Sequence, residues 1–165
     1  MGKNKKKKKQ LSDGEKKLFA DSIFLKGVHY YFRSLHRLLV ILMQRKLIND
    51  PFEKDIELRF NNRFKIFKNV LFLKKLTHET YLKEVESLMA EEGKVLDEAS
   101  ELLKAAKNIF GLFHQQFDES ETFFRQREES MALEKLCVKL SLAVITLKLK
   151  QARKFAIRKE HPKYP

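Results

Sequence analysis

The stretch FLKGVHYYFRSLHRLLVILM, residues 24–43, decides the fold. Apolar side chains in and just before it recur in steps of three and four residues: Ala20, Phe24, Val28, Tyr31, Leu35, Leu38 and Leu42. This spacing places one apolar stripe along an α-helix. From Leu38 to Met43 every side chain is apolar, so we expect this end to be surrounded on more than one side. The stretch therefore predicts a long helix packed against other helices.

Capping signals flank this helix. Ser12 and Glu15 have the spacing of a capping box, in which the hydroxyl accepts from the Glu15 amide and the carboxylate reaches back. At the other end, Asn49-Asp50-Pro51 predicts termination, because the residue before a proline is pushed out of the α region. Asp50 and Pro51 also suit the N-cap and first position of a second helix.

Three further apolar stripes follow. The first runs from Phe52 to Leu71, and the second runs from Thr77, a predicted N-cap, to Phe117, with a break or kink expected near Gly93. The members of the last stripe are Leu133, Leu136, Leu140, Val144 and Leu147. No strand pattern accompanies them. The sequence predicts an all-α fold, an antiparallel bundle or hairpin stack of about four long helices.

The charge is uneven along the chain. Of the net charge of +13, residues 1–17 carry +6 and residues 146–165 carry +6, whereas residues 18–145 are nearly balanced. A lysine-rich segment of this kind repels itself, so residues 1–11 are predicted to form a disordered tail. We expect one helical domain over 12–160 and a short C-terminal tail over 161–165.

Catalytic and metal-binding patterns are missing from the sequence. The five histidines are scattered, and none lies in a His-Glu-x-x-His or Glu-x-x-His pattern. His114 and Asp118, one turn apart, offer only one edge of a metal site. There is no glycine-rich phosphate loop and no nucleophile elbow. We therefore predict no enzyme activity, no cofactor and no small-molecule ligand for this chain alone.

The compartment follows from the lone cysteine and from hydropathy. Cys137 is interpreted as a small buried hydrophobe, which fits a reducing compartment such as the cytosol or nucleus. The longest apolar run, residues 38–43, is far shorter than the roughly 20 residues that a bilayer requires. A cytoplasmic location without membrane insertion is expected.

The segment LRFNNRFKIF, residues 58–67, has three interpretations. Phe60, Phe64 and Phe67 share one helix face, with Arg59 and Arg63 along its edge, and ordinary core packing is the simplest reading. Base stacking on exposed rings is the alternative, but it needs rings on a basic surface. Four apolar stripes also exceed what a small domain buries internally, and a surplus face would bind a partner helix.

Five stretches resemble, in order, segments from the C-terminal part of the large auxiliary subunit of the N-terminal acetyltransferase C complex. The match of ELRFNNRFKIF to the family's RY-x-x-RF-x-x-F segment falls on Arg59, Phe60, Arg63, Phe64 and Phe67. The others are FLKGVHYYFRSLHRLL (24–39), YLKEVESL (81–88), EASELLKAAKNIF (98–110) and KLSLAVITLKLKQARK (139–154). Two departures are that the proline-rich turn before the YL stretch is replaced by VLFLKKLTHET and that the family's earlier regions are absent.

The resemblance implies a non-catalytic helical scaffold whose partners are the catalytic acetyltransferase subunit and other auxiliary subunits. It makes packing or interface residues of Arg59, Phe60, Arg63, Phe64, Phe67, Tyr81 and Leu82.

Basic residues at the N-terminus suggest a further contact. Clustered lysines give salt-sensitive attraction to phosphates, so ribosomal RNA is a candidate partner for Lys3, Lys5, Lys6, Lys7, Lys8 and Lys9. The lysines could equally serve only to keep this end soluble. A rival interpretation is an RNA-binding helical protein that acts in ribosome assembly or RNA processing. A membrane-surface helix that uses the tails and residues 38–43 fits less well, because about 30 residues separate these segments.

Overall fold

The computed structural model describes residues 12–48, 56–70, 77–117 and 123–160, with side chains over 12–48, 57–65, 77–117 and 123–153. Within these ranges the chain forms five helices and no strand, which confirms the predicted all-α bundle. The helices are α1 (Asp13–Gln44), α2 (Ile56–Val70), α3 (His78–Ala90), α4 (Glu92–Gln116) and α5 (Phe124–Glu160). The break expected near Gly93 is complete at Glu91, so α3 and α4 are separate helices.

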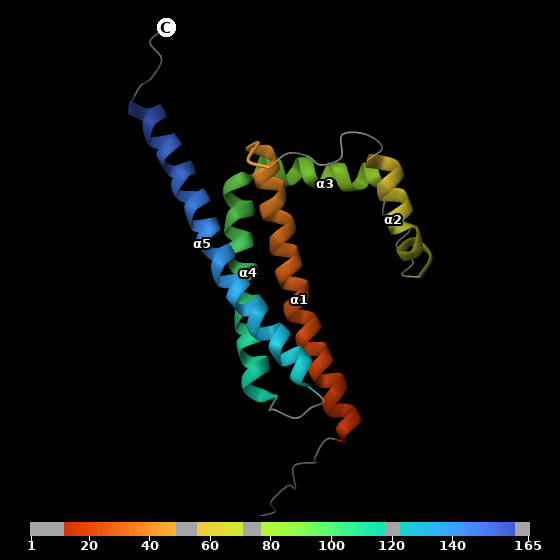
Figure 1. Ribbon diagram of the computed structural model, residues 1–165. Coiled ribbons are helices and arrows are strands. Elements are labelled where there is room, and N and C mark those ends of the chain that lie inside the picture. The colour runs from red at the N-terminus through yellow and green to blue at the C-terminus, as the bar shows by residue number, and fades with distance from the viewer. Residues whose placement is uncertain (1–11, 49–55, 71–76, 118–122, 161–165) are drawn as a thin grey trace, which may run out of the picture.

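Three long helices form the bundle (Figure 1). α1 runs antiparallel to α4, which in turn runs antiparallel to α5. α4 packs along both neighbours, whereas α1 and α5 contact each other mainly at the end where they begin, with Gln126 Nε2 donating to Asp21 Oδ1 at 2.7 Å. The helix between the other two, α4, therefore contributes more of the core than either neighbour, through these buried side chains: Val95, Leu96, Ala99, Leu103, Ala106, Phe110 and Phe113.

Small residues let α1 approach α4 closely. Ala20, Gly27 and Ser34 recur every seven residues and are fully or nearly fully buried. A Cβ built on Gly27 would lie 2.7 Å from Cε1 of Phe110, so only glycine leaves room for that ring. The hydroxyl of Ser34 donates to the Ala99 carbonyl at 2.9 Å, which satisfies this buried polar group.

On α1 the predicted stripe faces the core, with Leu38 buried and Val28 and Leu42 packed against it, although the closest approach to α4 belongs to the small residues. One detail of the predicted stripe on α5 is wrong. On α5, Leu136 is 41% exposed, and its neighbour Cys137 is buried in its place. The spacing of apolar residues predicts which face of a helix is apolar, but how deeply each side chain is buried depends on the shape of the helix packed against it.

The predicted end of the first helix is also misplaced. α1 ends at Gln44, where the Lys46 and Leu47 amides donate to the Met43 and Leu42 carbonyls, each at 2.9 Å. This is a Schellman arrangement, and Lys46 occupies its left-handed position with φ of 55°. The Asn49-Asp50-Pro51 signal and the proposed cap of the second helix lie outside the described residues.

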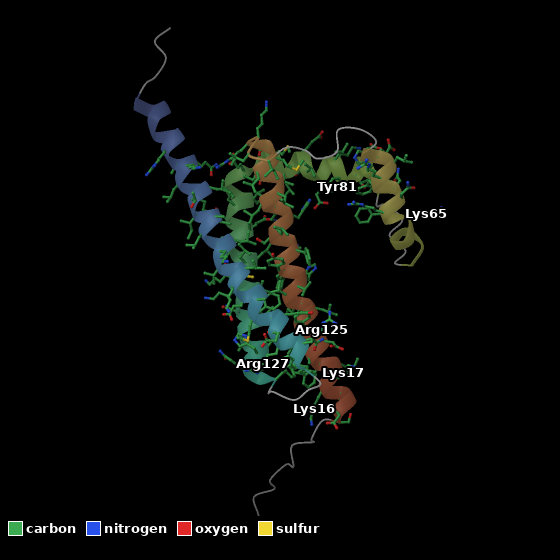
Figure 2. All side chains as sticks on the ribbon, viewed as in Figure 1. Lys16, Lys17, Lys65, Tyr81, Arg125 and Arg127 are labelled. Carbon is green, nitrogen blue, oxygen red and sulfur yellow. The ribbon has the colours of Figure 1, made fainter. Side chains whose placement is uncertain are left out.

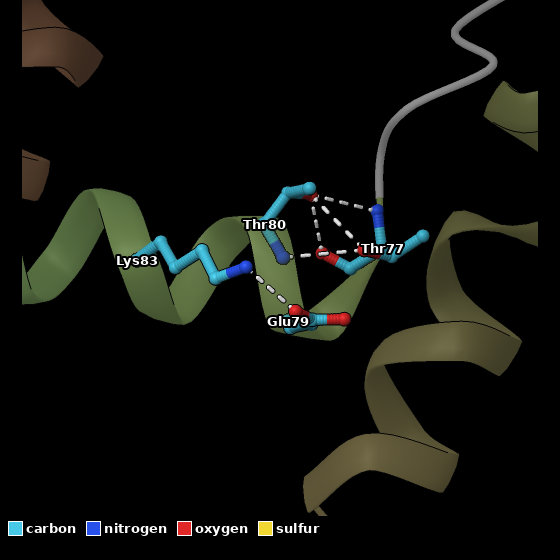
Figure 3. A network of polar contacts seen from close by, with 4 residues as sticks. All are labelled: Thr77, Glu79, Thr80 and Lys83. Atoms are coloured by element: carbon cyan, nitrogen blue, oxygen red, sulfur yellow. Dashed lines mark hydrogen bonds and ion pairs between the residues drawn. The ribbon is translucent and has the colours of Figure 1, made fainter.

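The two predicted N-caps that lie among the described residues, Ser12 and Thr77, are confirmed. At α1, the Glu15 amide donates to Ser12 Oγ at 3.3 Å and the Ser12 amide donates to Glu15 Oε2 at 2.8 Å. At α3 the same reciprocal box joins Thr77 and Thr80, with threonine in the place usually taken by Glu or Gln (Figure 3).

α2 and α3 form an arm that leaves the bundle. α3 crosses the C-terminal end of α1, where Gln44 Nε2 donates to the Met89 carbonyl at 3.1 Å (Figure 1). Among the described helices α2 packs against α3 alone. No residue of α3 is buried, and neither is any described side chain of α2. The arm therefore has no core of its own comparable with that of the bundle.

Polar contacts join α1, α4 and α5 at the end of the bundle where α1 ends and α4 begins. Arg45, just after α1, pairs with Glu92 at the start of α4, with its Nε 2.6 Å from Glu92 Oε1, and its Nη1 donates to the Leu147 carbonyl of α5 at 3.3 Å. Beyond this link α5 continues to Glu160, well past the first turn of α4 (Figure 1). The side chain of Gln151 lies beside Gly93, so about nine residues of the helix extend past α4.

Several predicted features lie outside the described residues. They are the two tails, over 1–11 and 161–165, with Lys3, Lys5, Lys6, Lys7, Lys8 and Lys9, and also Asp118. In the part of the chain that is described, no helix has both the length and the apolar character needed to cross a bilayer.

Candidate interaction surface

The arm brings together three of the predicted family residues. The Phe60 ring centroid lies 4.6 Å from that of Phe64, 5.4 Å from that of Tyr81 and 5.6 Å from that of His78. Separations of this size are typical of favourable aromatic pairs. Tyr81, labelled in Figure 2, also lies 5.9 Å from the ring of His36 on α1. A chain of rings thus connects α2 through α3 to the bundle.

The other residues that the sequence resemblance singled out are Arg59, Arg63, Leu82 and Phe67. Arg59 and Arg63 are exposed on α2, and Leu82 is 44% exposed on α3. Phe67 belongs to α2, but its side chain is outside the described set. Phe60 and Phe64 are half-buried against α3, apart from the core of α1, α4 and α5. The arm therefore presents an aromatic and basic surface of its own.

A surface hollow of about 460 Å³ lies where α3 crosses α1. Burial lowers the pKa of His36 in its wall, an effect that Arg37 reinforces and Glu84 opposes. Arg37 is already held by Glu98, with Nε 2.9 Å from Oε2. The remaining wall consists of His29, Phe32 and Arg33. The wall mixes both charges, and one arginine is already paired, so it does not form an anion site.

The described residues hold no group of three or more metal-ligating side chains. His114 lies 3.5 Å from Glu134, from Nε2 to Oε2, a contact between α4 and α5. Cys137 is fully buried, and burial raises the pKa of its thiol to about 11, with Glu134 adding to the shift. A protonated, inaccessible thiol fits the predicted role of a small core residue.

α1 carries a second apolar stripe on the side away from α4. Leu18, Leu25, Phe32 and Leu39 are seven residues apart and between 41% and 71% exposed. At 100° per residue this stripe lies roughly opposite Ala20, Gly27 and Ser34. α3 crosses only the C-terminal part of this face, so Leu18, Leu25 and Phe32 face away from the rest of the bundle.

α5 is also apolar on two faces. Val138, Leu142, Ile145 and Leu149 are all exposed, while Cys137, Val144 and Leu147 are buried. We call the exposed set the outer stripe of α5.

The sequence predicted a surplus apolar face without indicating which helix carries it. The seven-residue spacing of Leu18, Leu25, Phe32 and Leu39 was the available signal.

Charged side chains gather where α1 and α5 begin, and Figure 2 labels Lys16, Lys17, Arg125 and Arg127 there. Two of them are paired along their own helices, Lys16 with Asp13 at 3.1 Å and Arg125 with Glu129 at 3.0 Å. These pairings reduce the net positive field at this end of the bundle.

Comparisons of the chain with protein-family models, with curated proteins and with solved structures find no match.

Proposed function

We propose that this chain is a non-catalytic helical scaffold that supports an N-terminal protein acetyltransferase in the cytoplasm. The observation that carries the proposal is the two-sided character of α1. One face is buried on α4, and the opposite face exposes Leu18, Leu25 and Phe32. Helices that are apolar on two sides are typical of the interior of larger helical assemblies.

The energy available to a partner on this face is substantial. Full burial of a Leu or Phe side chain contributes about 1.5–3 kcal/mol, and three such side chains lie in line along α1. Contiguous exposed apolar surface of this kind marks protein interaction sites more often than it occurs on a self-contained monomer.

The kind of complex comes from the sequence resemblance. The motif residues Phe60, Phe64 and Tyr81 lie in one aromatic cluster on the arm. In this proposal the arm and the outer face of α1 contact the catalytic subunit and other auxiliary subunits. The acyl transfer itself belongs to the catalytic partner, so this chain needs neither cofactor nor substrate site.

The test is affinity purification of the tagged full chain from cell lysate at low and at moderate salt, with and without nuclease. We expect an acetyltransferase subunit to be retained under nuclease and moderate salt. Phe32→Gln should reduce that retention, because it removes apolar surface from the outer face of α1. Leu112→Gln on α4, 51% exposed against 59% for Phe32, is the matched control. Retention of the acetyltransferase unaffected by Phe32→Gln would overturn the proposed contact.

RNA binding is the competing function. An RNA-binding protein would retain ribosomal proteins that are lost on nuclease treatment, with no acetyltransferase present. If the basic tail instead anchors a scaffold at the ribosome, deletion of residues 2–9 should weaken co-sedimentation with ribosomes at low salt and leave partner retention unchanged. Unchanged co-sedimentation would exclude this role of the tail.

A further inference from the structure

The outer stripe of α5 is separate from the core. Its members Val138, Leu142, Ile145 and Leu149 are 42%, 61%, 52% and 58% exposed. The buried positions Cys137, Val144 and Leu147 centre on a direction roughly 140° away around the helix. The outer stripe is therefore a second contact surface, on the side of α5 away from α4.

The spacing of the stripe suits a helical occupant. Steps of four, three and four residues reproduce the pattern of two heptads, whose side chains insert as knobs between the residues of a facing helix. Leu142 and Leu149 alternate with β-branched Val138 and Ile145. The spacing places the leucines at the a positions and the β-branched residues at the d positions, an order that favours assemblies of more than two helices. That agrees with a helix already packed on α4.

The charge around the stripe specifies the occupant further. From Lys135 to Arg153 the helix contains five basic residues and no acid. Lys148 is paired with Asp97 of α4 at 2.7 Å, which leaves four that make no ion pair with any described residue. Lys135 lies seven residues before Leu142, in line with the stripe, and Lys139 and Arg153 lie three and four residues from Leu142 and Leu149 along one edge. The fourth, Lys150, directly follows Leu149.

We propose that the outer stripe of α5 binds an acidic amphipathic helix of a partner subunit. Leucine-type side chains of that helix would fill the stripe, and its Glu or Asp side chains would face the four basic residues. This rests on the scaffold part of the proposed function and names the chemistry of a partner, without depending on which enzyme the complex contains.

Two other occupants fit less well. A second copy of α5 would bring the edge with Lys139 and Arg153 against the same basic edge of its partner in a symmetric pairing, which is repulsive. A lipid surface prefers a broad apolar face with the basic residues around the polar side of the helix. Here α5 packs on α4 along one side, and the exposed apolar surface beside the basic residues is a narrow stripe.

The experiment uses the full chain and a fluorescently labelled synthetic peptide of three heptads with Leu at the core positions and Glu at the flanking ones. A second peptide carries Lys in place of Glu. Fluorescence anisotropy should show saturable binding of the Glu peptide, weaker at higher salt, and much weaker binding of the Lys peptide. Leu142→Gln with Leu149→Gln should weaken binding by about tenfold or more.

The matched control is Leu58→Gln with Leu112→Gln, two leucines that are 61% and 51% exposed and lie off the stripe. This pair should leave peptide binding unchanged. Thermal unfolding of both double variants should equal that of the wild type, because all four side chains are exposed.

Four outcomes would overturn the proposal, and the first three concern peptide binding and self-association. The two peptides could bind equally well, or the double variant Leu142→Gln with Leu149→Gln could bind the Glu peptide as strongly as the wild type does. The wild-type chain could also self-associate in sedimentation while this double variant does not. Co-flotation with phosphatidylserine vesicles, without binding of the Glu peptide, would assign the stripe to lipid and also reject it. Failure to purify an acetyltransferase, with Glu-peptide binding intact, would reject the acetyltransferase assignment alone.

Discussion

The bundle and the arm use similar residues with different results. α4 places Phe110 and Phe113 on one face, and both are fully buried. α2 places Phe60 and Phe64 on one face, and both remain half-buried. The difference lies in the opposite helix, since α1 supplies Gly27, which leaves room for the ring of Phe110, whereas α2 packs, among the described helices, against α3 alone. Aromatic periodicity thus predicts a helix face, and the partner helix decides whether that face becomes core.

The largest expected difference comes from truncating one ring in each region. Phe110→Ala should lower the free energy of unfolding by about 3–5 kcal/mol, because a fully buried ring leaves a cavity. Phe60→Ala should cost about 1 kcal/mol or less, because that ring is half-buried on α3 alone. Urea unfolding followed by circular dichroism measures both. Equal losses would contradict the distinction between bundle and arm.

A pair of glycines probes the close approach inside the bundle. Gly27→Ala should destabilise by about 1–2 kcal/mol, because its Cβ would lie 2.7 Å from Phe110 and overpacking outweighs the gain in helix propensity. At Gly111 the nearest atom to a new Cβ is Glu134 Oε1 at 3.5 Å, an ordinary contact. Gly111→Ala should therefore stabilise by up to about 1 kcal/mol. Two shifts of the same sign in thermal unfolding would be inconsistent with the tight α1–α4 contact.

Local signals in the sequence predicted much of this architecture. The caps at Ser12 and Thr77 and the break before Gly93 depend on a few neighbouring residues, so their patterns suffice. The end of α1 could not be predicted in the same way, because Lys46 adopts the left-handed position that usually belongs to glycine.

The candidate surfaces were harder to predict than the helices. The exposure of Leu142, Ile145 and Leu149 follows from which face of α5 meets α4, and three-dimensional packing decides that choice. Periodicity identified the buried stripe of α5, with Val144 and Leu147, but did not identify the second apolar stripe on the exposed side of the same helix. The motif singled out Phe60, Phe64 and Tyr81, but neither their meeting in one cluster nor the position of that cluster on an arm outside the core was predicted.

The junction between bundle and arm should respond to pH. Burial lowers the pKa of His36, whose ring faces Tyr81 of α3, so the folded state favours the neutral imidazole. The contribution of neutral His36 to the stability of the folded state is fully present above the ordinary histidine pKa of 6.5. It is lost as the pH falls through and below that value. Hydrogen exchange of α3 amides should accelerate on acidification more than that of α4 amides. His36→Phe should abolish the added acid sensitivity, and an unchanged response in this variant would assign it to other groups.

The smallest expected effect is at the end of α1. Lys46→Gly should raise the free energy of unfolding by about 0.5 kcal/mol, because glycine adopts the observed φ of 55° without steric cost. Lys104→Gly, at an exposed position inside α4, should instead lower it by about 0.7 kcal/mol. Thermal unfolding compares the two. A loss of stability in Lys46→Gly would contradict the Schellman arrangement.

Because α5 is a continuous helix, the part that extends beyond α4 has a defined length and direction. About nine residues past Gln151 carry the helix axis roughly 14 Å outward, in a direction set by the packed segment before it. Every residue along this extension has a fixed azimuth, and one alanine inserted after Gln151 would rotate everything beyond it by about 100° while advancing it only about 1.5 Å. The orientation of each residue on this extension is thus set by the number of residues that separate it from the segment of α5 packed on α4.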